Sequence, residues 1–282
     1  MCEFCHKHGE GKIWYMQVSN YSEDLLSDIR RRKFVQEFFL HPEKLLEDEK
    51  MVLQLNRLPS FIRAIIMPFA IGRQKRTHYG QVVPIEDIDH VLGFVNSVTR
   101  LPCICRQATV GSEQRYCYGF SMVPHAESQM GQIVRSLGAE YLTGPSTSGV
   151  EVLSKEDAAK SIRDLEKKGC CHTVWTFMTP FIGGFCNCDR ADCMAMKATV
   201  TLNFPVIFRA EYVALVDPDL CNGCRQCMRA CQFGVIGYSI AHNKVTIDPS
   251  KCYGCGICRS SCTKDAIKLS DRSKVALAAG LW

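Results

Sequence analysis

The first hundred residues carry apolar side chains at helical spacing. Across residues 22–40, apolar positions recur every three or four residues behind a Ser and two acidic residues, which are typical of a capped helix start. A second helix is predicted from residue 42 to about 58, and a third from 85 to about 98. This part of the chain is therefore expected to be mostly helical.

The longest apolar run lies at residues 61–72. It spans about a dozen residues and contains Arg63 and Pro68, whereas a membrane-spanning helix needs about 20 apolar residues. We expect no membrane span. Docking on a partner or on a membrane surface is an alternative, but a buried core segment is the favoured interpretation.

Further along the chain, the pattern changes to turn residues. Residues 101–149 are rich in Gly, Pro, Ser and Cys and need a tertiary constraint, which cysteine ligation could supply. Residues 154–168 predict a surface helix with a Ser cap and a Gly stop. Residues 170–177 predict a buried strand.

An internal repeat with a period of 31 residues begins near Val216. Asp217 and Pro218 match Asp248 and Pro249, and each pair is followed by the same ladder of cysteines. Such a duplication is typical of one compact unit with pseudo-twofold symmetry. We expect an α+β protein with a mostly helical, cysteine-rich N-terminal domain at residues 1–210 and a small repeat-containing domain at 211–282.

Composition narrows the class of protein. The 282 residues are 46% hydrophobic and 22% charged, as in soluble globular proteins, and the net charge is only +5. The only dense basic run covers residues 30–33, and its side chains would point in several directions on a helix, so nucleic-acid binding is not expected.

The 18 cysteines are far more than usual, and in a chain of this length they indicate metal binding rather than disulfides. The first residues lack the apolar run of a signal peptide, so a reducing cytoplasm is the expected location.

Both repeats read C-x2-C-x2-C-x3-C. Three thiolates at this spacing can surround one face of a cubane, and the fourth begins a short helix that carries it to the other cluster. The predicted ligands are Cys221, Cys224, Cys227 and Cys262 for one [4Fe–4S] cluster, and Cys231, Cys252, Cys255 and Cys258 for the other. Zinc-binding or free thiols would not easily explain the duplication.

The glycine before the second cysteine of each repeat, Gly223 or Gly254, is expected to let the backbone approach the inorganic sulfides. Residues 211–269 closely resemble the bacterial dicluster ferredoxins. The resemblance implies two hairpins and two short helices around the clusters. The family's usual proline after the fourth cysteine is replaced by Gln232 and Thr263, which is expected to loosen the turn.

Ten cysteines lie outside the repeats. The motif C-I-C-R begins at Cys103, and C-N-C-D-R-A-D-C begins at Cys186. Two thiols in C-x-C are expected to reach one ion or cluster only from an irregular backbone. A third [4Fe–4S] cluster is predicted from four of Cys103, Cys105, Cys186, Cys188 and Cys193, with Cys117 in reserve; a zinc site or buried thiols are the alternatives. Cys170 and Cys171 are expected to be buried in their strand.

These motifs, together with the helix at residues 154–168 and the G-x-x-H that ends at His172, resemble a group of larger ferredoxin-like proteins of anaerobes. That resemblance implies further iron–sulfur in the N-terminal part. At the N-terminus, Cys2, Cys5 and His6 match a c-type haem motif, which we reject because no export signal accompanies it. With His8 they could hold zinc or another cluster, and an unliganded terminus is the alternative.

Glycine-rich nucleotide motifs and H-E-x-x-H are absent from the sequence, so flavin or nicotinamide chemistry is expected in a partner. The leading hypothesis is an electron-transfer subunit of an anaerobic oxidoreductase complex, with a flavin- or metal-containing oxidoreductase as its redox partner. The alternatives are a redox enzyme subunit with an open-site N-terminal cluster and an assembly or activation protein for another metalloenzyme. Arg225, Arg229, Arg259 and Lys264 could steer an acidic partner or could be simple surface charges.

Overall fold

The computed structural model describes residues 14–111, 114–124, 127–138 and 150–281. Its α-helices are α2 (Ile29–Leu40), α3 (Glu43–Asn56), α4 (Ser60–Thr77), α5 (Ile85–Phe94), α6 (Ile104–Val110), α7 (Gln129–Ser136), α8 (Lys155–Lys167), α9 (Met194–Met196), α10 (Gln226–Ala230) and α11 (Ile257–Ser260). Its strands are β1 (Gly80–Val82), β2 (Ser97–Leu101), β3 (Cys117–Ser121), β4 (Glu151–Leu153), β5 (Cys171–Thr176), β6 (Ile182–Cys188), β7 (Ile207–Phe208), β8 (Tyr212–Val216), β9 (Ile236–Ser239), β10 (Lys244–Ile247) and β11 (Ile267–Asp271).

A seven-stranded sheet forms the centre of the N-terminal part, in the order β4-β2-β3-β6-β5-β1-β7. All neighbours are antiparallel except β1 and β7. The mixture of helices and strands agrees with the predicted α+β class. Apart from β5, the sequence did not predict the sheet, because strands such as β3 are buried on both faces and show no polar alternation.

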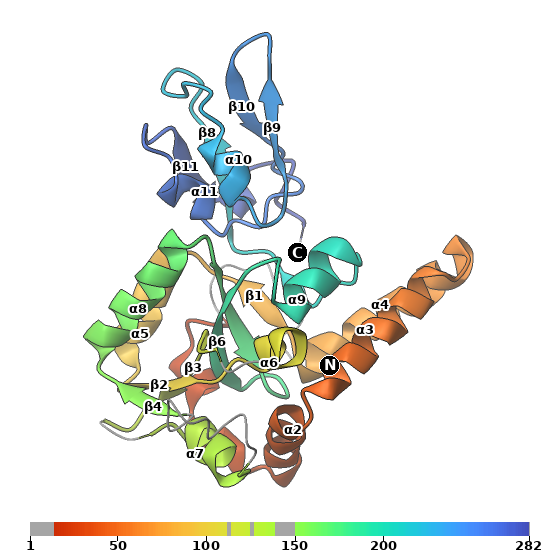
Figure 1. Cartoon of the computed structure of the whole chain (residues 1–282), viewed down its shortest axis with the longest axis vertical. Coiled ribbons are helices and arrows are strands. Elements are labelled where there is room, and N and C mark those ends of the chain that lie inside the picture. Colours follow the sequence, from red (N-terminus) through yellow and green to blue (C-terminus); the bar gives the residue numbers. More distant parts are fainter. Residues whose placement is uncertain (1–13, 112–113, 125–126, 139–149, 282) are drawn as a thin grey trace.

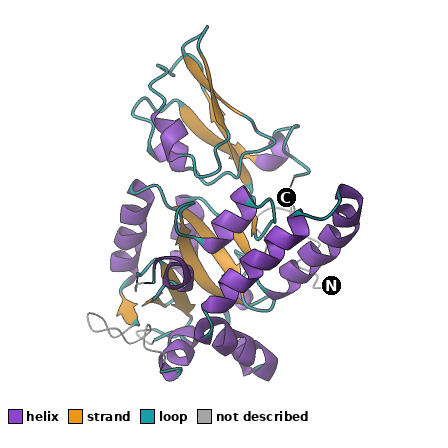
Figure 2. Ribbon diagram, turned by 45° about the vertical axis from the view of Figure 1, so that its right-hand side comes forward, coloured by secondary structure: helices purple, strands orange, loops and turns teal. Residues whose placement is uncertain are grey.

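The two faces of the sheet belong to different apolar clusters. Helices α5 and α8 pack beside Val98, Phe120 and Phe185 on one face. The other face carries Cys117 and Trp175 and meets α2, α7 and α9. Figures 1 and 2 show these helices arranged around the sheet.

The predicted helices exist, but two of their boundaries differ. Ser22 caps only a short 3-10 helix at Glu23–Ser27, and Asp28 then caps α2 by accepting a hydrogen bond from the backbone N–H of Arg30 at 2.8 Å. The helix α5 ends at Phe94, where the expected helix becomes strand β2. The predictions of α3, of α8 and of the buried strand β5 are confirmed.

The apolar run at residues 61–72 forms most of α4, which pairs with α3 in a hairpin that projects from the body (Figure 1). The prediction that it is a buried core segment is wrong. Phe61, Ile65 and Phe69 are 68%, 65% and 76% exposed, because their four-residue spacing places them on one outward face. Within the described residues, no helix is both long and apolar enough to cross a membrane.

The two repeats fold into one unit, which comes after the strands of the central sheet in the sequence. Strands β9 and β10 form a hairpin, whereas β8 pairs with β11 from the other end of the unit, so only one of the two expected hairpins is a true hairpin. Helices α10 and α11 start at positions 31 residues apart, after left-handed Arg225 (φ 63°) and Gly256 (φ 81°). The division of the chain at residue 210 stays a prediction.

Candidate functional site

Two cavities lie inside the repeat unit. The outer cavity is lined by Cys221, Cys224, Cys227 and Cys262. The inner cavity is lined by Cys231, Cys252, Cys255 and Cys258. Each therefore collects three cysteines of one repeat and the fourth cysteine of the other, which is the crossed arrangement expected from the spacing.

Two glycines hold the repeats together across the pseudo-twofold axis. Gly223 and Gly254 both have φ near +72°, and a Cβ on them would lie 2.3 Å from the carbonyl oxygen of Asn243 and 2.1 Å from that of Tyr212, respectively. Both the glycines and the carbonyls are 31 residues apart. Each glycine is thus required by a close approach to a backbone carbonyl, and the predicted approach to inorganic sulfide stays a prediction.

The chemistry of the donors around both cavities fits a cluster. Burial raises the pKa of the Cys227 thiol to about 11 and that of Cys258 to about 12. Thiolates therefore need a cationic metal core beside them, and soft sulfur donors are typical iron–sulfur ligands. The backbone N–H groups of Ala214 and Gly254 donate to Cys252 Sγ, each at 3.4 Å. Such hydrogen bonds tune the reduction potential of a bound cluster.

The duplication allows the two cavities to be compared position by position. Where the outer cavity has Asn222, Arg225 and Lys264, the inner cavity has Tyr253, Gly256 and Phe233. The rings of Phe233 and Tyr253 are stacked with centroids 4.0 Å apart. The outer cavity is thus polar and cationic, and the inner one is aromatic.

Of the basic residues proposed to steer a partner, Arg225, Arg229 and Lys264 are exposed. Arg259 instead forms an ion pair of 2.5 Å with Glu86 of α5. This ion pair offsets part of the charge of Arg259, and the steering role of all four residues stays a prediction.

The cysteines of the N-terminal part gather on one face of the central sheet. Cys117 of β3 lies directly opposite Cys186 of β6, and their sulfurs are 3.3 Å apart. Cys188 follows on the same face, since side chains alternate along a strand. The expectation that C-x-C needs an irregular backbone is wrong for this pair, because a regular strand points residues i and i+2 to the same side.

The starts of two short helices complete this group. Cys103 precedes α6, Cys105 lies within it, and Cys193 precedes α9. The thiols of Cys103 interact with those of Cys105 and Cys117, and the Cys193 thiol interacts with those of Cys105 and Cys188. The structure thus brings all six predicted cysteines into one group, which we call the thiol pocket: Cys103, Cys105, Cys117, Cys186, Cys188 and Cys193.

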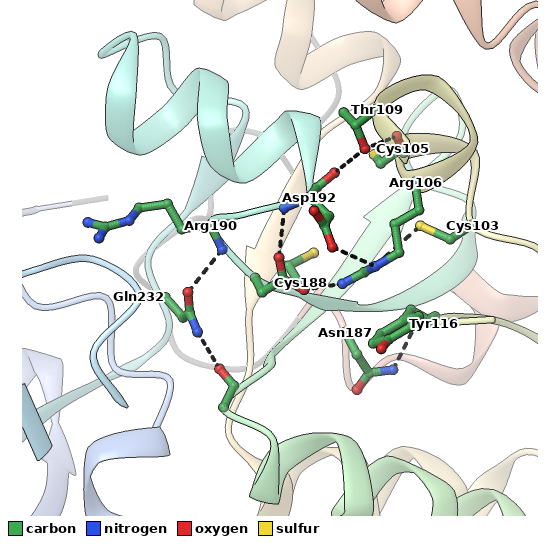
Figure 3. Close-up of polar contacts among 12 residues, drawn as sticks. Cys103, Cys105, Arg106, Thr109, Tyr116, Asn187, Cys188, Arg190, Asp192 and Gln232 are labelled. Carbon is green, nitrogen blue, oxygen red and sulfur yellow. Dashed lines mark hydrogen bonds and ion pairs between the residues drawn. The ribbon is translucent and has the colours of Figure 1, made fainter. Parts of the chain in front are cut away.

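A buried arginine supports the thiol pocket (Figure 3). Arg106 is 1% exposed, pairs with Asp189 and lies with its Nε 3.9 Å from Asp192 Oδ2. Its guanidinium carbon lies 3.5 Å from the centre of the Tyr116 ring, and its Nη1 donates to Cys103 Sγ at 3.6 Å. Arg106, the arginine of the C-x-C-R motif, is therefore a cation next to the pocket.

Ionisation within the pocket is unequal. Hydrogen bonds from the Cys105 and Cys117 thiols, followed by the charge of Arg106, lower the pKa of Cys103 well below its usual value despite burial. The same contacts with Cys103 raise the pKa values of Cys105 and Cys117. Cys103 is therefore the first of these thiols to become a nucleophilic, metal-binding thiolate.

Other predicted residues lie outside the pocket. Cys170 and Cys171 are buried as expected, and Cys171 is the cross-strand neighbour of Cys188. His172 points to the opposite face of the sheet, where its Nδ1 donates to Asn187 Oδ1 at 2.8 Å. The candidate ligands Cys2, Cys5 and His6 lie outside the described residues.

No three His, Cys, Asp or Glu side chains converge on a single metal-ion position within the described ranges. The cysteines around both cavities share this property, since cubane ligands are spread around several irons rather than one ion. Which metal centre the thiol pocket holds stays a prediction.

Gln232 anchors the turn that the sequence predicted to be loose. Gln232 replaces the family's proline, but its side chain does not leave the turn loose. Its Oε1 accepts a hydrogen bond from the backbone N–H of Arg190 at 2.9 Å, and its Nε2 donates to the Gly169 carbonyl at 2.7 Å (Figure 3). Both partners are distant in sequence, so only the fold reveals this contact.

Comparison with known proteins identifies the repeat unit. Residues 212–266 match the family model of the 4Fe–4S dicluster domain. No curated protein matches the chain. The chain therefore carries a ferredoxin-type dicluster domain at its C-terminus and binds iron–sulfur clusters.

Proposed function

We propose that this protein is the electron-transfer subunit of an anaerobic oxidoreductase complex and relays single electrons through three iron–sulfur centres. The observation that carries the proposal is the pair of cavities, each surrounded by four cysteines from both repeats. When bound, clusters supply one-electron redox chemistry, and the protein fixes their position and surroundings.

The cavity linings support two proposed ligand sets for the dicluster domain. Cys221, Cys224, Cys227 and Cys262 would hold the outer [4Fe–4S] cluster. Cys231, Cys252, Cys255 and Cys258 would hold the inner one. The structural duplication supports equal nuclearity at both positions, because each set occupies equivalent backbone positions.

The third centre would occupy the thiol pocket, with four of its six cysteines as ligands. Support comes from the mutual contact of the thiols and from Arg106, whose charge favours thiolate at Cys103. The alternative, a catalytic cluster with an open coordination site, requires that the protein supply fewer than four ligands. A pocket with six thiols offers more than a cubane needs, so it favours electron transfer over catalysis.

The outer cavity is the proposed contact point for an external redox partner. Cys224 is exposed there, Arg225 and Lys264 line the same cavity with positive charge, and Arg229 is exposed on the adjoining α10. A cationic rim raises the encounter rate with an acidic surface. We therefore propose a flavin- or metal-containing oxidoreductase with an acidic docking face.

The test is an iron count on protein purified anaerobically as the full chain, with acid-labile sulfide and an EPR spectrum after dithionite reduction. We expect about twelve irons per chain, four for each centre. About eight irons would restrict clusters to the dicluster domain and refute the third centre. If the protein never co-purifies with a catalytic subunit, the assembly-protein alternative becomes the better explanation.

A further inference from the structure

The dicluster domain is fixed to the N-terminal part by polar contacts around its inner cavity. Gln232 follows the inner ligand Cys231 and bonds to Gly169 and Arg190 at 2.7 and 2.9 Å. Ser260 Oγ donates to Glu166 Oε1 of α8 at 2.6 Å, close to the Arg259 ion pair with α5. The inner cavity therefore has a defined position relative to the central sheet.

Buried cysteines of both sites pack near the same contact. Cys188 of the thiol pocket lies opposite Cys171 in the register of β6 and β5. Cys171 is fully buried and shares one apolar cluster with Cys188 and with Cys255 of the inner cavity. Cys171 therefore lies between the pocket and the inner cavity.

We infer that the inner cavity and the thiol pocket form an internal electron-transfer junction, held in place by Gln232 and bridged by Cys171. This inference rests on the proposed function. One centre loses the single electron that the other gains, and no bond is made or broken. Since Cys171 belongs to neither ligand set, it acts as a positioning residue between them.

The outer cavity lacks this arrangement. Thr263 is the counterpart of Gln232, since both follow the fourth cysteine of a repeat and are 31 residues apart, and Thr263 is exposed. The aromatic pair Phe233 and Tyr253 replaces the charged lining of the outer cavity on the side of the junction. The two cavities of the duplicated unit therefore differ in their surroundings: one faces the N-terminal part and the other faces outward.

The duplication also supplies a matched pair of variants for the test. Gln232→Pro removes both hydrogen bonds of the carboxamide. Cys231 has φ −72° and ψ 104°, a conformation compatible with a following proline. Thr263→Pro makes the same change beside the outer cavity. Cys171→Ala is a second variant of the junction and preserves the strand.

The measurements are iron per chain and the EPR spectrum of the fully reduced, full-length protein. In the unaltered protein we expect about twelve irons and a spectrum broadened by magnetic interaction between centres. Gln232→Pro should keep the iron and reduce this broadening to the part that arises between the two clusters of the dicluster domain. Thr263→Pro should keep both. Cys171→Ala should keep the iron while changing the interaction.

The outcomes separate the junction from the function on which it rests. Twelve irons with a spectrum that is a simple sum of isolated centres would overturn the junction alone, as would equal effects of Gln232→Pro and Thr263→Pro. Loss of about four irons from Cys171→Ala would make Cys171 a ligand and overturn its bridging role. About eight irons in the unaltered protein would overturn the third centre and the junction together.

Discussion

Replacement of Arg106 by methionine tests the construction of the thiol pocket. The change removes the cation but keeps an apolar side chain of similar length beside Tyr116. Asp189 then loses its partner, and Cys103 loses its N–H donor. Because Arg106 is 1% exposed, its ion pair is a buried one.

Removal of one partner of a buried ion pair typically costs about 3–5 kcal/mol. Asp189 is 20% exposed and keeps a hydrogen bond from the backbone N–H of Asp192 at 2.8 Å, so water can partly solvate the remaining carboxylate. Loss of the stacking on Tyr116 adds to the cost, since a desolvated cation–π contact contributes about 2 kcal/mol. These opposing corrections keep the expected loss for Arg106→Met at about 3–5 kcal/mol.

The assay is urea unfolding under anaerobic conditions, followed by circular dichroism, together with an iron count. Arg106→Met should lose the iron of the thiol pocket and retain about eight irons in the dicluster domain. Asp189→Asn is the matched control, because Arg106 keeps Asp192 at 3.9 Å, so its cost should be smaller. The double variant should cost less than the sum of the two by about 1 kcal/mol or more. Stability within about 0.5 kcal/mol of the unaltered protein, with all iron retained, would refute the reasoning.

Three further predictions follow from other parts of the structure. Gly254→Ala should cost at least about 3 kcal/mol in urea unfolding, because its Cβ would lie 2.1 Å from a backbone oxygen. Gly256→Ala also has a positive φ, but its Cβ would meet only ordinary van der Waals neighbours at 3.4 Å or more, so it should cost about 1–2 kcal/mol. Equal costs would contradict the close approach at Gly254. Burial lowers the pKa of His172 from 6.5 to about 4, so the unfolded state binds more protons between these values. Stability should therefore fall as pH decreases from 6.5 towards 4, by about 1.4 kcal/mol per pH unit from this group, and His172→Gln should flatten the slope of midpoint against pH. Lys264→Glu should slow electron transfer to a small acidic redox protein about tenfold at low salt. Lys33→Glu makes the same charge change on α2, at the opposite end of the molecule (Figure 1), and should have no effect. Equal slowing by both variants would refute the docking proposal.

The repeat unit was predictable because its information is local. A 31-residue period, two cysteine ladders and two left-handed glycines lie within a short stretch of sequence. The crossed assignment of Cys231 and Cys262 needed only the rule that the fourth cysteine serves the other cluster. The cavity linings agree with that rule.

The N-terminal part was less predictable because its contacts are long-range. The sequence identified the cysteines of the thiol pocket as a group but not the sheet that collects them. Cys117 and Cys186 meet through strand pairing between segments 69 residues apart. Apolar pattern alone also misplaced α4, since a run of apolar residues looks the same whether it faces a core or the outside.

The departures from the family pattern gain a meaning once both repeats are compared. A proline after the fourth cysteine would fix the turn and contribute no side-chain hydrogen bond. Gln232 fixes its turn from outside, through Gly169 and Arg190, and so makes the turn depend on the N-terminal part. Thr263, free of that requirement, is exposed. The side chains at equivalent positions thus make the two copies of the duplication differ, while the cysteine ladders, Gly223 and Gly254 remain the same in both.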